Sequence, residues 1–177
     1  MTRYIAFLRA INVGGHVVKM DALRGLFESL GFSNVETFIA SGNVLFETNL
    51  NGNLEKKIES KLREALGYDV ATFIRTDAEL KAIANYKAFA QSQLDAATAF
   101  NVAFLKESLD DNSNQKVRSL RTDLDDFHVH GRELYWLCQK KQSDSTFSNA
   151  VLEKTLGRPS TIRGVNTIQK IAAKYQQ

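Results

Sequence analysis

The polar residues with the clearest chemical potential lie in one loop, from Arg9 to Lys19, between a short apolar run and a helical pattern. The pair Gly14–Gly15 lets backbone N–H groups approach a ligand, and a helix start adds unpaired N–H groups with partial positive charge. Arg9 and Lys19 add two cations and Asn12 adds an amide, so the loop points to an anion site. The spacing fits neither the dinucleotide fingerprint nor a P-loop, and a plain strand-to-helix connection would also use flexible glycines.

Two further polar stretches are candidates for the same site. Ser41-Gly42-Asn43 separates two strand-like runs, where a tight hairpin turn is the simplest interpretation and where the serine and asparagine side chains could also face a ligand. Arg163 and Asn166 lie where a short strand enters the last helix. Asn166 suits an N-cap, whereas Arg163 would pair with a carboxylate or bind an anion. Arg75 occupies the matching place earlier in the chain, which favours a structural role for both arginines.

Other side chains give weaker signals of chemistry. His128 and His130 lie two residues apart on one strand, which can begin a metal site, but no third ligand has a supporting spacing. Solvated histidines on the outer face are the preferred interpretation. Cys138 lies in an apolar strand, where a thiol is inert, and the acidic run 123–126 is expected to be a solvated loop. We therefore expect no metal and no cofactor, and the sequence names no catalytic residue.

Composition excludes several classes of protein. The chain has 177 residues, a formal charge of +3, a pI of about 9.0 and one cysteine. The mild basic excess is below that of a dedicated nucleic-acid binder, so nucleic acid is a less favoured partner. A single cysteine rules out an internal disulfide and fits a reducing compartment. No apolar run is long enough for a signal peptide or a bilayer span, so a cytoplasmic location without membrane contact is expected. The oligomeric state stays open.

Hydrophobic periodicity predicts strands and helices in a repeating order. Strands are expected at Tyr4–Leu8, Val35–Ala40, Val44–Phe46, Val70–Ile74, Phe100–Leu105, Phe127–Val129, Leu134–Cys138 and Thr161–Ile162. Helices are expected at Met20–Leu30, Asn53–Leu66, Asn112–Leu120, Phe147–Leu156 and Asn166–Tyr175, with a short one after Asp77. The order β-α-β-β-α-β, read twice, predicts an α+β fold of two tandem, duplicated ferredoxin-like halves, each with an extra C-terminal helix.

Local sequence supports the duplication. Leu66-Gly67 and Leu156-Gly157 end the second helix of each half, and Gly42 and Gly131 lie at matching hairpins. We place the N-terminal half at 1–85, a polar connection at 86–97 and the C-terminal half at 98–177. The strands of the first half are apolar on both faces, so the second face is expected to be covered too, most simply by the other half. The alternative is two independent sheets with chance apolar residues.

The N-terminal half combines several short motifs with single apolar residues, which are Asn12-Val-Gly-Gly, Lys19-Met20, Leu23, Gly31-Phe32, Val35, Thr37, Ile39, Ser41-Gly42-Asn43-Val44 and Phe46. This combination resembles the signature of a bacterial family, the domain of unknown function 1697. A C-terminal family stretch of the form Thr-x-Arg-Asn-Trp-Asn-Thr reads here from Thr161 to Thr167, with Gly164 and Val165 in place of the amide and the aromatic residue. The resemblance implies an α+β protein of two ferredoxin-like halves and implies no activity.

Two functions follow as hypotheses. The first is a small-molecule binding protein or enzyme for an anionic, phosphate- or nucleotide-like ligand. Its site would be formed by Arg9, Asn12, Gly14, Gly15, Lys19, Ser41, Asn43, Arg163 and Asn166. The alternative is a protein- or nucleic-acid-interaction module without catalysis. Polar turns that only stabilise the fold are a third interpretation.

Overall fold

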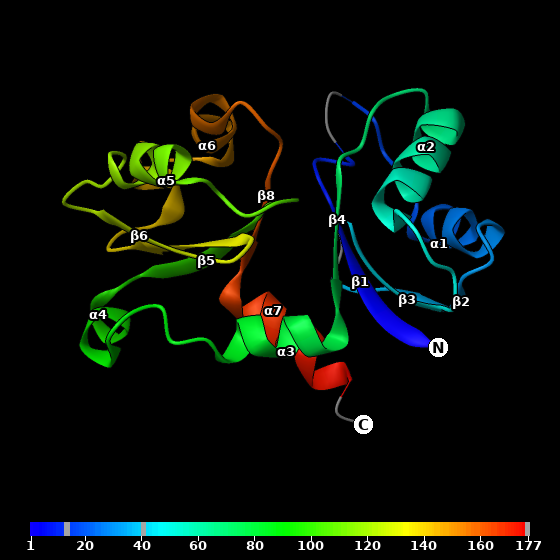
Figure 1. Ribbon diagram of the computed structural model, residues 1–177, viewed down its shortest axis with the longest axis horizontal. Helices are drawn as coiled ribbons and strands as arrows, with labels where there is room; N and C mark the ends of the chain where they lie inside the picture. The colour runs from blue at the N-terminus through cyan, green and yellow to red at the C-terminus, as the bar shows by residue number, and fades with distance from the viewer. Residues whose placement is uncertain (13–14, 40–41, 176–177) are drawn as a thin grey trace. The chain divides into compact units, whose positions relative to one another are not determined.

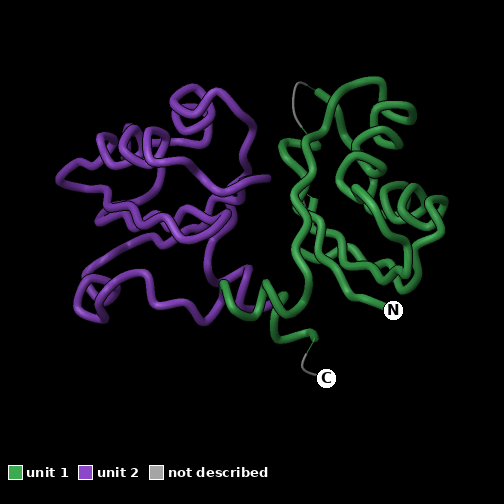
Figure 2. The backbone as a smooth tube through the Cα atoms, viewed as in Figure 1, with its two compact units in different colours: residues 1–83, 171–177 green, residues 84–170 purple. Residues whose placement is uncertain are grey.

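The computed structural model describes residues 1–12, 15–39 and 42–175, which form two compact units. The first unit holds residues 1–83 and 171–177, and the second holds residues 84–170 (Figure 2). The unit boundaries therefore differ from the predicted halves of 1–85 and 98–177. The predicted connection at 86–97 belongs to the second unit, and the C-terminal residues belong to the first. None of the helices among the described residues is long and apolar enough to cross a bilayer.

The first unit contains an antiparallel sheet of the strands β1, β2, β3 and β4, in the spatial order β2-β3-β1-β4. Its helices α1 and α2 lie on one face of this sheet (Figure 1). In chain order the elements are β1 (Thr2–Leu8), α1 (Met20–Ser29), β2 (Ser33–Thr37), β3 (Asn43–Thr48), α2 (Leu54–Leu66) and β4 (Thr72–Thr76). The helix α3 (Asp77–Asn85) then runs from the first unit into the second.

The second unit has the same arrangement of strands. Its sheet order is β6-β7-β5-β8, and every neighbouring pair is antiparallel. In chain order the elements are α4 (Gln91–Ala96), β5 (Ala99–Phe104), α5 (Asp111–Arg118), β6 (Asp125–His130), β7 (Glu133–Cys138), a 3-10 turn (Gln142–Asp144), α6 (Asn149–Leu156), β8 (Thr161–Gly164) and α7 (Val165–Lys174).

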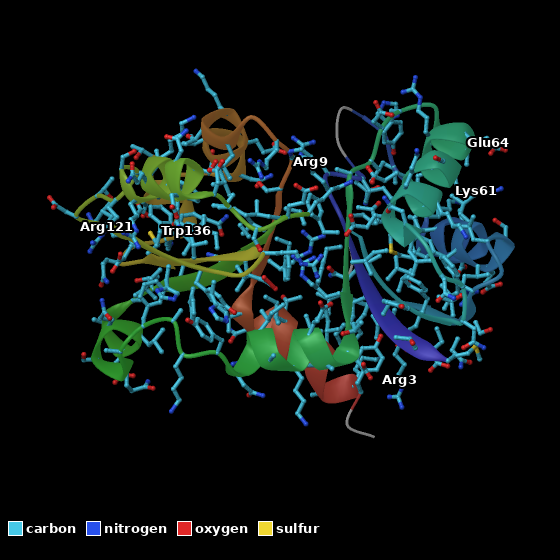
Figure 3. The ribbon with its side chains drawn as sticks, viewed as in Figure 1. Arg3, Arg9, Lys61, Glu64, Arg121 and Trp136 are labelled. Carbon is cyan, nitrogen blue, oxygen red and sulfur yellow. The ribbon has the colours of Figure 1, made fainter. Side chains whose placement is uncertain are left out.

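Each unit buries apolar side chains between its sheet and two helices. In the first unit, Ala6 and Leu8 of β1 pack with apolar side chains of α1 and α2, among them Leu23, Phe27, Ile58 and Leu62. In the second unit, Ala103 of β5 and Trp136 of β7 pack with Val117 of α5 and Leu152 of α6. Figure 3 labels Trp136, whose side chain is fully buried. Apolar residues at helical and strand spacing thus fold as their periodicity predicts.

Helix ends follow local capping chemistry. Asn53 Oδ1 accepts a hydrogen bond from Lys56 N at 3.0 Å at the start of α2, and Ser148 Oγ accepts one from Val151 N at the start of α6. Both helices end at a left-handed glycine, Gly67 or Gly157. Asn166, predicted as the N-cap of the last helix, is instead the second residue of α7.

The end of α7 and the residue after it, Tyr175, are held in the first unit by polar contacts. Tyr175 Oη donates a hydrogen bond to Tyr4 O at 3.0 Å, and Lys174 forms an ion pair with Glu36 of β2. The Lys174 ammonium also lies 4.4 Å from the centre of the Phe38 ring. The two residues in each contact lie far apart in sequence. Local sequence patterns therefore did not indicate that the C-terminal residues belong to the first unit.

Two local expectations were wrong. Residues Gln91–Ala96, expected to be a polar connection, form α4, which has a single large apolar side chain, Leu94, and so shows little periodicity. Asn43 was expected in a tight turn but begins β3, where it is 3% exposed. Of the other two turn residues, Gly42 is described and Ser41 lies outside the described residues.

A third correction concerns the acidic run. Asp125 is not solvated but 2% exposed. Its carboxylate accepts hydrogen bonds from Trp136 Nε1, Ser145 Oγ and Thr122 Oγ1, each at 2.8 Å. Burial by itself raises the pKa of this carboxyl, but the three donors outweigh burial and lower the pKa below its usual value. Asp125 therefore anchors the segment after β7 to the sheet as a buried anion.

Gly42 is required by close packing. Its φ is +95°, and a Cβ atom there would lie 3.0 Å from Leu8 Cβ and 3.1 Å from Leu8 O. We expect Gly42→Ala to lower the free energy of unfolding by about 2 kcal/mol or more, because a clash adds to the backbone strain. Gly52→Ala is the matched control, since Gly52 has a φ of +101° and a Cβ atom there would meet no atom within 4 Å. Chemical denaturation should give the larger loss for Gly42→Ala, and equal losses would contradict the packing argument.

Asp125 should give the second unit a pH-dependent stability. The lowered pKa means that the stabilisation is present above the unfolded value of about 4 and is lost as pH falls through the folded pKa. Asp125→Asn should cost about 2 kcal/mol at pH 7, and the gap from the wild type should shrink below about pH 4. Denaturation curves from pH 3 to 8 test this, with the exposed Asp123→Asn as control. A gap that stays constant to pH 3 would refute the buried anion.

Candidate functional site

The predicted loop is anchored to the segment between α2 and β4. Ile11 is 1% exposed, and its carbonyl oxygen accepts a hydrogen bond from Tyr68 Oη at 2.8 Å. The His16 ring lies 4.3 Å from the Tyr68 ring, centre to centre. Asn12 Oδ1 accepts a hydrogen bond from Val18 N at 2.8 Å, which closes the loop just before α1. The Asn12 side-chain carbonyl is therefore used in the fold.

Asn43 and Arg163 also bond to their own backbone surroundings. Asn43 Nδ2 donates to Phe38 O at 3.1 Å and to Ile39 O at 3.2 Å. Arg163 Nη1 donates to Thr161 Oγ1 at 2.7 Å and to Ile162 O at 3.0 Å. Burial lowers the pKa of Arg163 to about 10, so the guanidinium stays charged at neutral pH. Both side chains support the backbone that carries them.

The nine predicted site residues divide between the two units. Arg9, Asn12, Gly15, Lys19 and Asn43 belong to the first unit, and Arg163 and Asn166 belong to the second. Arg9 follows β1 and is labelled in Figure 3; its backbone N–H donates to Ala71 O at 2.9 Å. Gly15 has a φ of +80°, so the loop does use glycine's freedom there. Gly14 and Ser41 lie outside the described residues, and a composite site of all nine stays a prediction.

A pocket of about 450 Å³ lies within the second unit, and Asn166 lines it. The rest of its wall comes from three segments: the end of α3 with the residues that follow it, the segment from α4 to β5, and the start of α7. Side chains with aromatic or polar groups on this wall are Asn85, Tyr86, Lys87, Thr98, Phe100, Asn166 and Gln169. Aromatic surface with a few polar groups in a hollow is typical of small-molecule sites.

Tyr86 is fixed from behind by the two histidines of β6. Its hydroxyl lies 2.8 Å from His128 Nε2, and its ring stacks on His130 with centres 4.0 Å apart. The Tyr86 ring also lies 5.2 Å from the Tyr135 ring. The expectation of solvated histidines was therefore wrong for His128, which is half-buried. The aromatic pair Tyr86 and Phe89 after α3 was the sequence signal that could have indicated a cover for this strand.

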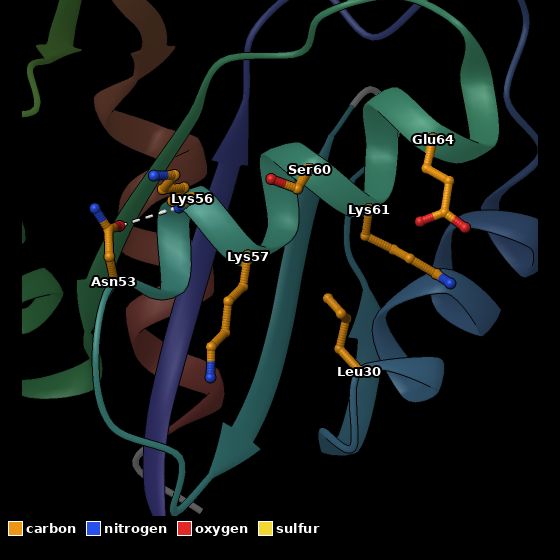
Figure 4. A pocket seen from close by; sticks show the side chains of 7 residues that line it. All are labelled: Leu30, Asn53, Lys56, Lys57, Ser60, Lys61 and Glu64. Atoms are coloured by element: carbon orange, nitrogen blue, oxygen red, sulfur yellow. Dashed lines mark hydrogen bonds between the residues drawn. The ribbon is translucent and has the colours of Figure 1, made fainter.

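An open groove of about 520 Å³ lies along α2 in the first unit (Figure 4). Its wall is formed by Leu30 and by a row of α2 side chains together with the N-cap, which are Asn53, Lys56, Lys57, Ser60, Lys61 and Glu64. Three lysines against one glutamate make this wall basic. Sequence reasoning missed the groove, because alternating charges on a helix indicate only a solvated face.

No cluster of metal-binding side chains is present in residues 1–12, 15–39 and 42–175. No group of three or more His, Cys, Asp or Glu side chains there is placed to hold an ion. Cys138 is fully buried in β7, and burial raises the pKa of its thiol, which disfavours the reactive thiolate.

Substitution can test whether the acceptor oxygen of the Asn12 side chain stabilises the loop. Asn12→Ala should lower the free energy of unfolding by about 1 kcal/mol, because Val18 N–H loses its partner. Asn12→Asp keeps an acceptor and should recover most of that loss. Chemical denaturation measures both, with the exposed Asn51→Ala as control. If Asn12→Ala is as stable as the control variant, the hydrogen bond to Val18 does not hold the loop.

Both the sequence and the fold are similar to those of known proteins. The family model described as "Protein of unknown function (DUF1697)" matches residues 1–135. A solved structure of a conserved bacterial protein from Streptococcus pneumoniae is similar over 100% of this chain and 99% of its own, with 25% identity and a TM-score of 0.81. No curated protein matches the sequence. The match over residues 1–135 covers well over half of the 177 residues, so the chain belongs to the DUF1697 family of proteins of unknown function.

Proposed function

We propose that the protein binds a small anionic, nucleotide-like molecule in the pocket of the second unit. The observation that carries this proposal is the pocket itself, a hollow of about 450 Å³ whose wall combines aromatic rings, amide side chains and a lysine. Pockets of this size accommodate ligands of nucleotide dimensions. The proposal keeps the predicted ligand class and moves the main site toward Asn166.

The wall offers one type of group for each part of such a ligand. Tyr86 and Phe100 present aromatic surface for a planar ring. Asn166 and Gln169, both exposed on α7, carry amides that donate and accept along the edge of a heterocycle. Lys87 supplies a positive charge for a phosphate or carboxylate group. No reaction is proposed for this wall.

The loop from Arg9 to Lys19 remains a second place for an anion. Two cations and a helix start support it, and Lys19 is exposed immediately before α1. Against it, the carbonyl of Asn12 and the amide nitrogen of Asn43 already serve backbone groups. We therefore rank the loop below the pocket as a binding site.

We also infer that the two units are duplicated ferredoxin-like folds. Support comes from the matching sheet orders β2-β3-β1-β4 and β6-β7-β5-β8. Arg75 of β4 and Arg163 of β8 make the same bond, in which Nη1 donates to the carbonyl of the preceding residue. Left-handed glycines end α2 and α6 alike. A repeated origin accounts for all three similarities.

The alternative, an interaction module, is favoured by the basic groove of α2. Lys56, Lys57 and Lys61 could bind the phosphates of a nucleic acid or the carboxylates of a protein. Positively charged helix faces are common on soluble proteins, so this groove is the weaker of the two candidates.

Thermal-shift screening against nucleotides, sugar phosphates and short RNA tests the pocket. A ligand at about a hundred times its dissociation constant adds roughly 2.7 kcal/mol of stability. We expect a nucleotide to raise the melting temperature of the wild type, and Asn166→Ala and Gln169→Ala to reduce that shift. Gln115→Ala, an exposed glutamine change on α5, is the matched control and should leave the shift unchanged.

Two results would contradict the pocket. One is the absence of any small-molecule shift across the panel. The other is a shift that is unchanged in both Asn166→Ala and Gln169→Ala. A shift with RNA alone that is lost in Lys57→Gln would favour the interaction module instead.

A further inference from the structure

We propose that protonation of His128 decides whether the Tyr86 hydroxyl accepts or donates a hydrogen bond in the pocket. This proposal rests on the proposed function for its ligand, although the state of the side-chain pair can be measured without one. Tyr86 is the residue that connects the two sets of contacts: it lines the pocket, and it touches both histidines of β6.

The geometry leaves Tyr86 little freedom. Its ring is nearly parallel to that of His130, with an interplanar angle of 10°. Its hydroxyl oxygen lies 2.8 Å from His128 Nε2, which is a full hydrogen bond. A second aromatic side chain, Phe89, lies 6.4 Å from the His128 ring in an edge-on arrangement. The hydroxyl is thus held at a fixed point beside a titratable nitrogen.

The direction of that hydrogen bond depends on the charge of the imidazole. When His128 is neutral with its proton on Nδ1, Nε2 accepts and the Tyr86 O–H donates to it. The oxygen lone pairs of Tyr86 then remain to accept from a ligand donor. When His128 is protonated, both ring nitrogens are donors, so Nε2–H donates to Tyr86 Oη. The Tyr86 O–H is then released to donate to a ligand acceptor.

Charged groups around this pair come from three elements. On β6, Asp126 lies two residues before His128 and pairs with Arg121 Nε at 2.9 Å, while Gln93 of α4 also bonds to Asp126. On β7, Tyr135 is opposite His128 and Glu133 is opposite His130. The segment after α3 contributes Lys87, next to Tyr86 in sequence. Burial raises the pKa of Tyr135 well above its usual value, so that phenol stays neutral.

The switch matters for an anionic ligand. Phosphate and carboxylate oxygens are acceptors only, so they bond to Tyr86 only when its O–H is released. Imidazole is the side chain that ordinarily changes charge between about pH 5 and 8. An anion should therefore bind more tightly at the acidic end of that range, by about tenfold if one hydrogen bond of about 1.4 kcal/mol is gained.

Nitrogen NMR of the histidine side chains tests the pair without a ligand. At pH 8 we expect His128 to carry its proton on Nδ1 in the wild-type protein, with Nε2 as an acceptor. Tyr86→Phe should shift His128 toward the Nε2–H form, because the donor to Nε2 is gone. A wild-type protein with Nε2–H at pH 8 would overturn the proposal. This measurement on the unaltered protein decides the question even if the variant does not fold.

Binding of a cyclic nucleoside monophosphate tests the consequence, because its phosphodiester charge does not change over this pH range. Affinity should rise about tenfold between pH 8 and pH 5.5 in the wild type, and the rise should disappear in His128→Gln. His16→Gln is the control, since His16 belongs to the first unit and is not part of the pocket wall.

The two proposals fail in different ways. If the ligand binds and the binding is lost in Gln169→Ala but does not depend on pH, the pocket stands and the switch is wrong. If the predicted proton position is found while no ligand binds, the pair stands and the proposed function is wrong.

Discussion

β1 and β5 each lie between two antiparallel neighbours, and this central position constrains the rest of each unit. Four successive residues of β1, from Ile5 to Leu8, are at most 1% exposed, so neither face of the strand reaches solvent. Backbone pairing continues at the end of the strand and one residue beyond it, where Leu8 N bonds to Gly42 O and Arg9 N bonds to Ala71 O. The loop that follows therefore starts from a fixed point, which explains why Ile11 is buried and tied to Tyr68.

Sequence patterns predicted the elements that depend on apolar spacing. The helices at Met20 and Leu54 and the strands around them appear within a few residues of the expected bounds. Such elements are recognisable because a helix or strand that packs on a core must repeat apolar residues at its own period. α4 lacked that repeat and was missed. The family was also recognisable, because its signature depends on residue identity and not on packing.

Polar side chains were harder to place than apolar ones. Asp125, Asn43 and His128 were all expected at turns or on solvated surfaces, and each is buried or half-buried against partners. Their partners lie from a few to about forty residues away, as with Trp136 and Tyr86. A polar side chain is buried only where a hydrogen-bond partner is in place. A single sequence does not show which residue will be that partner. Binding sites are made of such groups, so the pocket was not predicted, and Asn166 is the one predicted site residue on its wall.

The membership of residues 171–177 in the first unit has a consequence for the order of folding during synthesis. The first unit begins with β1, yet the contacts that Tyr175 makes with Tyr4 form only after all of the second unit has been translated. Domains ordinarily fold one after another as the chain emerges. Here the first unit is synthesised first but cannot complete its contacts until the last residues have been synthesised. The second unit can therefore begin to fold before the first unit is complete.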